Sequence, residues 1–95
     1  MELVFDGHVI EWRGPSPFYF ATVPDEESDR IREVAALATY GWGVIPVEAG
    51  IGDTTFTTSL FPRDGAYLLP LKAAVRKLQD IAAGDDVTVR MTIRL

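Results

Sequence analysis

The chain contains no cysteine and a single histidine, His8. The lack of cysteine excludes disulfide bonds, thiolate metal sites and a cysteine nucleophile, so redox chemistry says nothing about the compartment. One histidine without cysteines makes a poor metal site, and we expect neither a metal nor a cofactor. The first residues alternate in polarity where a signal peptide would show a basic start and an unbroken apolar run, and no segment has transmembrane length. We therefore expect a cytoplasmic protein without membrane contact.

Positive charge is also scarce, with 9 Lys and Arg against 14 Asp and Glu, a formal net charge of −5. This balance repels polyanions and disfavours non-specific binding to nucleic acids, although a local basic patch stays possible. The composition, 47% hydrophobic and 24% charged residues, is that of an ordinary globular protein. Its length of 95 residues fits one domain, which we place at residues 1–95.

Alternating polarity and a wealth of β-branched and aromatic residues predict six strands. The clearest is the last, whose apolar residues share one face: Val87, Val89, Met91, Ile93 and Leu95. The other five are expected at residues 3–12, 18–23, 42–49, 54–61 and 66–69. Pro46 in the third of these segments predicts an edge strand or a bulge. The segment Pro62–Gly65 predicts a type I turn that begins at Phe61.

A proline opens each of two predicted helices. The first covers residues 24–38 and carries acidic residues in its first turn, near the positive end of the helix dipole. The second starts at Pro70, with an apolar stripe of Leu71, Ala74, Val75, Leu78 and Ile81. The order ββαβββαβ describes a mainly β protein. Because six short strands leave exposed edges unless the sheet closes, we expect a small barrel capped at its ends by the two helices.

The two halves of the chain echo one another. A shift of 46 residues lays Pro24 on Pro70, Arg30 on Arg76, and residues 20–23 on residues 66–69. Each half then reads strand, proline, helix, strand, which suggests two related units packed about a pseudo-twofold axis. A shift of 47 aligns the apolar helix residues better, so coincidence of architecture stays an alternative.

The run from Phe56 to Ile93, "FTTSLFPRDGAYLLPLKAAVRKLQDIAAGDDVTVRMTI", combines a proline after a strand, a Gly-aromatic strand, "PLKAAVR" and a "GDDVTV" ending. With "FYFATVP" and "AGIGDTTF" upstream, the chain resembles the bacterial domain of unknown function 1905 over nearly its whole length. The resemblance implies a small double-split β-barrel and no known activity. That family usually has a glycine just before the isoleucine that ends the second helix and a second glycine in the hairpin; here these are Asp80 and Asp53.

The spacing of the proline, arginine, isoleucine and Gly-Asp pair in the same run is also similar to the swapped-hairpin barrels of the antitoxin and transition-state-regulator class. Those proteins dimerise and bind DNA, each chain supplying half a barrel. This resemblance implies a nucleic-acid-associated or antitoxin-like regulator as one alternative function.

Several side chains could form a ligand or partner surface. The cations on the second helix, on the outer face of the last strand and at the predicted turn would contact phosphates if they converged, and Trp42 between two glycines could line a groove. These candidates are Trp42, Arg63, Lys72, Arg76, Arg90 and Arg94. A solvated surface and core packing explain the same residues without a ligand.

The chemistry favours a non-enzymatic binding or interaction module with an unidentified protein or small-molecule partner. The chain has no phosphate-binding glycine motif and no nucleophile elbow. His8 and Asp6 share a strand face and could form an acid–base pair. A small-molecule-binding barrel with a site near His8, Asp6 and Trp42 is therefore the second alternative.

Overall fold

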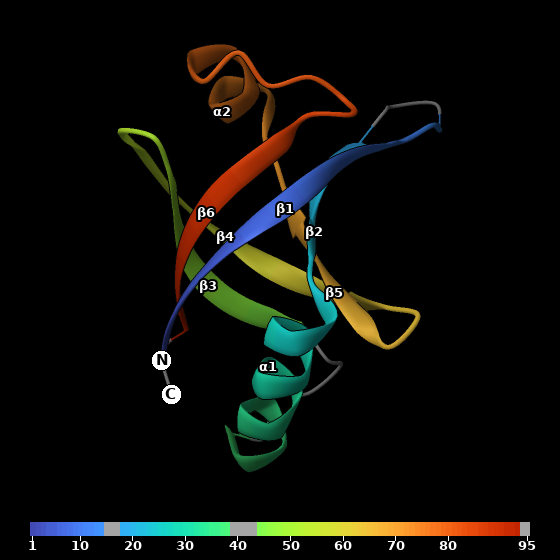
Figure 1. Cartoon of the computed structure of the whole chain (residues 1–95), viewed down its shortest axis with the longest axis vertical. Helices are drawn as coiled ribbons and strands as arrows, with labels where there is room; N and C mark the ends of the chain where they lie inside the picture. Colours follow the sequence, from blue (N-terminus) through green and yellow to red (C-terminus); the bar gives the residue numbers. More distant parts are fainter. Residues whose placement is uncertain (15–17, 39–43, 94–95) are drawn as a thin grey trace.

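The computed structural model describes residues 1–14, 18–38 and 44–93. Six strands form a closed barrel in the order β1-β2-β5-β4-β3-β6, and every neighbouring pair is antiparallel. Two helices lie at opposite ends of this barrel (Figure 1). The elements are β1 (Glu2–Trp12), β2 (Phe18–Val23), α1 (Asp25–Ala38), β3 (Ile45–Ile51), β4 (Thr54–Arg63), β5 (Ala66–Pro70), α2 (Ala73–Leu78) and β6 (Asp86–Ile93). The predicted mainly β barrel of order ββαβββαβ is confirmed.

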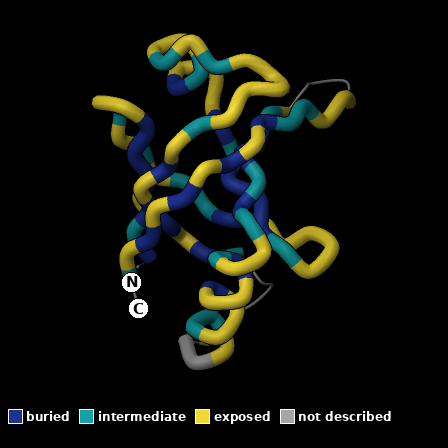
Figure 2. Tube along the Cα trace, viewed as in Figure 1, coloured by how far each residue is buried: buried dark blue, intermediate teal, exposed yellow. Residues whose placement is uncertain are grey.

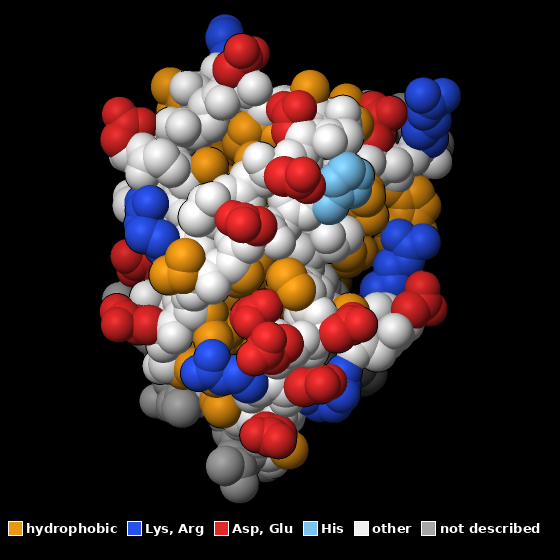
Figure 3. Space-filling model, in the orientation of Figure 1, with side chains coloured by type: hydrophobic (Ala, Val, Ile, Leu, Met, Phe, Trp, Pro, Cys, Tyr) orange, Lys and Arg blue, Asp and Glu red, His pale blue; other side chains and the backbone are white. Residues whose placement is uncertain are grey.

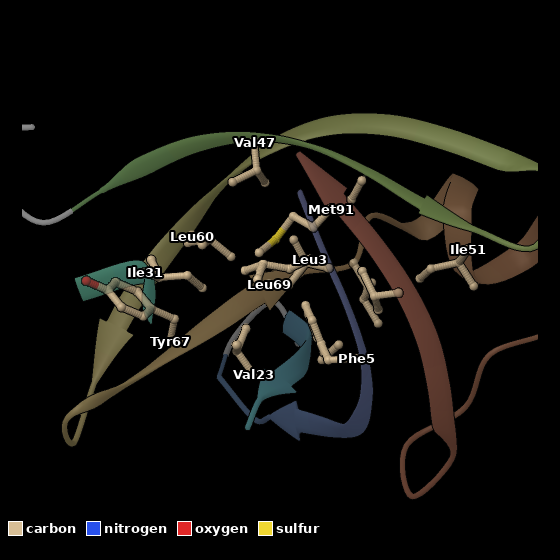
Figure 4. Close-up of a cluster of buried hydrophobic side chains, with 14 of the residues drawn as sticks. Leu3, Phe5, Val23, Ile31, Val47, Ile51, Leu60, Tyr67, Leu69 and Met91 are labelled. Carbon is tan, nitrogen blue, oxygen red and sulfur yellow. The ribbon is translucent and has the colours of Figure 1, made fainter. Parts of the chain in front are cut away.

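The core fills the inside of the barrel, because alternate residues of each strand point inward. In β1 every second residue from Leu3 to Val9 is buried, and the residues between them are exposed. Figure 2 shows this alternation along the strands. In β6, Val89, Met91 and Ile93 are buried as predicted, while Leu95 lies outside the described residues. Side chains from different strands meet in one cluster, in which Leu60, Leu69 and Met91 are central (Figure 4).

Helix α1 closes one end of the barrel and confirms the prediction for residues 24–38, beginning one residue after Pro24. Acidic side chains fill its first turn, where the helix dipole favours them. Ile31 is fully buried and points from the helix toward the core beside Tyr67 (Figure 4). Neither α1 nor α2 is long and apolar enough to cross a membrane.

The prediction for the second helix was wrong at both ends. Pro70 does not start α2 but ends β5, and the helix runs only from Ala73 to Leu78. Leu69 and Leu71, on either side of Pro70, are both buried, and the N–H of Leu71 donates to the carbonyl oxygen of Tyr19 in β2 at 2.9 Å. This contact with β2 holds the segment around Pro70 to the barrel and keeps it out of the helix. Leu78, expected on the apolar stripe, is 71% exposed.

The end of α2 depends on Asp80, which takes a φ of +52°. The N–H of Ile81 then donates to the carbonyl oxygen of Arg76 at 2.9 Å, and the N–H of Gln79 donates to Val75 at 3.1 Å. The bond from Ile81 is the 6→1 bond of a Schellman motif, in which a residue in the left-handed region turns the chain back over the last helical carbonyls, and the bond from Gln79 is an ordinary helical bond. The three residues that the sequence predicts as helix after Leu78, namely Gln79, Asp80 and Ile81, therefore form the end of α2.

The turn after β4 also differs from the prediction. Strand β4 continues through Pro62 to Arg63, and the loop consists of Asp64 and Gly65 alone. Both have positive φ, 51° and 79°, which identifies a type I′ turn in place of the predicted type I turn. The backbone twist of a type I′ turn matches the right-handed twist of the flanking strands. The pairing of β4 with β5 therefore continues to Arg63, two residues beyond the predicted end of the strand.

Pro46 does not mark an edge strand, because β3 pairs with β4 on one side and β6 on the other. It lies opposite Ser59 in β4, whereas the described pairing with β6 covers Val47 to Gly50. The missing N–H of Pro46 therefore falls beyond that ladder and removes none of its hydrogen bonds.

The strand order has a twofold character. Exchanging β1 with β4, β2 with β5 and β3 with β6 converts the order of the barrel into itself. Each half of the chain contributes two antiparallel strands, one helix and one further strand. This topology is compatible with the two related units suggested by the sequence.

Candidate functional site

Three aromatic side chains cluster on the outer face of the barrel, at the turn end of the β1–β2 hairpin. Trp12 and Phe18 are paired in the ladder and are 52% and 62% exposed. Phe20 is buried beside them, with its ring centroid 6.2 Å from that of Trp12 and 6.5 Å from that of Phe18. They face outward because the neighbouring residues Tyr19 and Ala21 occupy the inward positions of β2.

The β4–β5 hairpin supplies the opposite wall. Phe61, 45% exposed, belongs to β4, and Pro70 ends β5. The two walls enclose a groove of about 690 Å³. We call it the aromatic groove; its main lining residues are Trp12, Phe18, Phe20, Phe61, Arg63 and Pro70. Figure 3 shows hydrophobic side chains reaching the surface at the right edge of the molecule, between the two hairpins.

Both charged residues that line the aromatic groove in the described part of the chain are arginines. The guanidinium carbon of Arg63 lies 4.6 Å from the centroid of the Trp12 ring, a cation–π geometry. Its Nε atom is 3.7 Å from Asp64 Oδ2, and Asp64 is 92% exposed, so this ion pair is weak. Arg13 lies across the groove and contacts Glu11, Nε to Oε1, at 3.3 Å. The groove is thus apolar with a basic rim.

A second polar cluster lies at the mouth of the barrel near α2. The Tyr19 hydroxyl donates to Glu11 Oε2 at 2.5 Å, and the Arg76 guanidinium carbon is 3.8 Å from the Tyr19 ring centroid. The hydrogen bond from Tyr19 is the main cause that lowers the pKa of Glu11. The same bond raises the pKa of Tyr19, because it would be lost with the proton. The hydrogen bond between Tyr19 and Glu11 and the contact of Arg76 with the Tyr19 ring connect α2 to the β1–β2 hairpin.

The remaining predicted cations have separate partners. Lys72 Nζ donates to the carbonyl oxygen of Thr57 at 3.2 Å, and Arg90 Nη2 donates to that of Gly52 at 2.7 Å. Of the predicted surface residues, the structure brings Arg63 into the aromatic groove and places Arg76 over the Tyr19 ring at the mouth of the barrel. Trp42 and Arg94 lie outside the described residues.

The pair of His8 and Asp6 that their shared strand face allows does not form. His8 Nδ1 lies 2.9 Å from Asp86 Oδ1, whereas Asp6 Oδ1 accepts a hydrogen bond from Thr88 at 2.7 Å. The reason is the β1–β6 ladder, in which Asp86 and Thr88 lie directly opposite His8 and Asp6 and are nearer than residues two positions along one strand. Both side chains of the His8–Asp86 pair are mostly exposed, at 55% and 76%.

No group of three or more His, Asp or Glu side chains that could hold a metal ion occurs within residues 1–14, 18–38 and 44–93. The aromatic groove combines an apolar wall with a basic rim, a composition that suits a binding site. The aromatic groove was not identified from the sequence, because the aromatic residues of both walls were assigned to strands of the barrel and not to a shared surface. The available signal was that Trp12 and Phe18 flank one turn at outward positions, while Phe61 precedes the other.

Comparison with protein families gives a match that covers most of the chain. A family model described as "Domain of unknown function (DUF1905)" matches residues 5–91, which include both hairpins of the aromatic groove. None of the curated proteins matches the chain.

Proposed function

The chain belongs to the DUF1905 family, and from that premise we propose that it is a non-enzymatic binding module whose aromatic groove holds a small apolar ligand. The observation that carries the proposal is the joint exposure of Trp12, Phe18 and Phe61 along one groove. Contiguous apolar surface of this kind commonly marks a binding site in a soluble domain. The groove volume of about 690 Å³ also falls within the range of about 300–1,000 Å³ that is typical of small-molecule sites.

The use of the titratable groups supports a role without catalysis. His8 is exposed on the barrel wall and paired with Asp86, away from the residues that line the aromatic groove. Glu11 and Tyr19 are hydrogen bonded to each other. Catalytic acids and bases are usually found in clefts, poised toward a substrate.

Regulation through nucleic acid is less well supported. The chain has a net charge of −5, and the contacts of Arg63, Lys72, Arg76 and Arg90 each go to a different neighbour. A titration with mixed-sequence DNA at low salt tests this alternative, since phosphate contacts produce binding that weakens steeply with salt. Cytoplasmic residence and a bacterial source stay predictions of the sequence.

The proposal can be tested with a neutral fluorescent probe, N-phenyl-1-naphthylamine, whose emission rises in apolar surroundings. The background is Trp42→Phe, which leaves Trp12 as the one tryptophan and allows energy transfer to report proximity. We expect saturable binding at one site per chain and transfer from Trp12. Replacing Trp12 by Ala should weaken the binding roughly 10-fold or more, the effect of removing a central aromatic contact.

The matched control is Val4→Ser, because Val4 is 66% exposed on the same strand and does not line the groove. It should leave the affinity unchanged. An absence of saturable binding, or an equal loss in both variants, would contradict the proposed function.

A further inference from the structure

We propose that the ligand of the aromatic groove is a flat apolar anion, whose rings lie against the aromatic side chains and whose acidic group is bound by Arg63. This inference rests on the proposed function, because it requires that the groove bind a small molecule. It adds the chemical class of that molecule.

The first argument is charge complementarity. The protein as a whole carries a net charge of −5, yet the charged side chains that line the aromatic groove, Arg13 and Arg63, are both positive. A small anion in the groove meets local attraction, whereas a long polyanion meets the repulsion of the whole molecule. The site therefore favours compact ligands that carry one acidic group.

The second argument is the position of the Arg63 side chain. It lies over the Trp12 ring at 4.6 Å and is still 45% exposed, so its guanidinium stands where the apolar wall meets solvent. Its ion pair with Asp64 engages Nε at 3.7 Å. A guanidinium has five N–H donors in a planar fork, so within the described part of the chain the two Nη nitrogens can serve a carboxylate or sulfonate in a bidentate contact.

The third argument is the shape of the apolar wall. Trp12 and Phe18 present rigid rings from one hairpin, and Phe61 presents a third from the other hairpin. Aromatic side chains pack against other rings in offset or tilted arrangements that contribute beyond simple burial. A flat ring system uses these contacts, and an acidic group at its edge reaches the basic rim.

The experiment compares two probes with the same ring system on the Trp42→Phe background. One is 8-anilinonaphthalene-1-sulfonate, an apolar anion with a flat naphthalene ring, and the other is N-phenyl-1-naphthylamine, which lacks the sulfonate. We expect the anion to bind roughly 10-fold more tightly, the scale of a charge-assisted hydrogen bond, and to lose that advantage in Arg63→Gln. The affinity of the neutral probe should change less than about twofold in this variant, because its contacts are apolar.

Two controls isolate the charge of Arg63. Lys77→Gln removes the same charge from an exposed position on α2 and should leave the preference intact. Asp64→Asn removes the carboxylate that competes for Arg63 and should strengthen binding of the anion. Each variant is used after its near-ultraviolet circular dichroism has matched that of the parent, because partly folded proteins also bind the anionic probe.

The outcomes separate the two proposals. Equal affinity for both probes, with no effect of Arg63→Gln, would overturn the anion preference and leave the apolar site standing. Binding of neither probe would overturn both. Self-association that is lost in Trp12→Ala, or displacement of the probes by peptides alone, would assign the groove to a protein partner and overturn the inference.

Discussion

The Oγ atom of Ser28 in α1 accepts a hydrogen bond from the backbone N–H of Tyr67 in β5 at 3.2 Å, and its hydroxyl donates to the carbonyl oxygen of Val23 at 3.1 Å. Ser28 is the one fully buried polar side chain among the residues that the structure describes. Ser28→Ala leaves two buried backbone groups without this partner. We therefore expect the free energy of unfolding to fall by about 1–3 kcal/mol, measured by urea denaturation.

Glu33→Ala is the control for this substitution, since Glu33 is exposed on the same helix. It should change the stability by less than about 0.5 kcal/mol. If Ser28→Ala unfolds with the same free energy as the wild type, the hydrogen bonds of Ser28 do not stabilise the contact of α1 with β5.

The hydrogen bond between Tyr19 and Glu11 predicts a defined pH dependence. Because this bond lowers the pKa of Glu11 below its ordinary value, the carboxylate stabilises the fold above that value, and the contribution is lost as the pH falls through the lowered pKa. Tyr19→Phe removes the donor, so the pKa of Glu11 should move upward. Carboxyl-carbon NMR titration measures it directly, and an unchanged pKa in the variant would exclude Tyr19 as the main cause.

The pKa of Tyr19 shifts in the opposite direction to that of Glu11. Its pKa is raised because the phenol donates to Glu11, so its contribution to stability is present below the ordinary pKa of a tyrosine and is lost as the pH rises through the raised value. In Glu11→Gln the phenol should ionise at lower pH than in the parent. Ultraviolet difference spectra at 295 nm, a wavelength characteristic of tyrosinate, follow this ionisation.

Two glycines predict different costs for the same added methyl group. A Cβ at Gly7 in β1 would lie 2.9 Å from the carbonyl oxygen of Thr22 and 3.2 Å from the Cβ of Ala21, so the barrel wall would have to shift. Gly65 has a φ of +79° and nothing within 4 Å of its added Cβ. We expect Gly7→Ala to cost about 1–3 kcal/mol through overpacking and Gly65→Ala about 1 kcal/mol through the backbone alone. Thermal unfolding should rank them in that order; the reverse ranking would contradict the close approach of β1 and β2.

Asp80 offers a stabilising substitution. Its φ of +52° is costly for a side chain with a Cβ, whereas glycine adopts such a backbone angle without that cost. Asp80→Gly should raise the free energy of unfolding by about 0.5–1 kcal/mol. Lys77→Gly within α2 is the contrast, because glycine there lowers stability. A loss of stability in Asp80→Gly would show that the aspartate side chain matters more than its backbone angle.

The strand pattern was predictable because burial inside a barrel imposes a period of two on the sequence. The last strand shows it plainly, with Val89, Met91 and Ile93 buried and Arg90 exposed. The second helix was not predictable from its apolar spacing. Leu71 fits a strand pattern with Leu69, two residues before it, and a helix pattern with Val75, four residues after it. The hydrogen bond of Leu71 to Tyr19 on the neighbouring strand decides between them.

The aromatic groove could be predicted only in part. The sequence shows that Trp12 and Phe18 flank a turn, but it does not show that Phe61 arrives beside them from a segment more than forty residues away. The same applies to His8, whose partner Asp86 is supplied by the far end of the chain. Both the aromatic groove and the His8–Asp86 pair depend on which distant strands lie side by side, and the local spacing of residues carries little information about that.

The twofold strand order bears on the strand at which the chain can begin. Met1 and Ile93 are joined by backbone hydrogen bonds of 3.0 and 2.8 Å, so a short connection could bridge them. Consider a chain whose original ends are connected and whose new ends lie between Gly52 and Asp53. Its segments follow the order β4, β5, α2, β6, β1, β2, α1, β3, which again reads ββαβββαβ. Such a circular permutant would present the same succession of strands and helices as the original, so β1 and β4 are equivalent starting strands for this barrel.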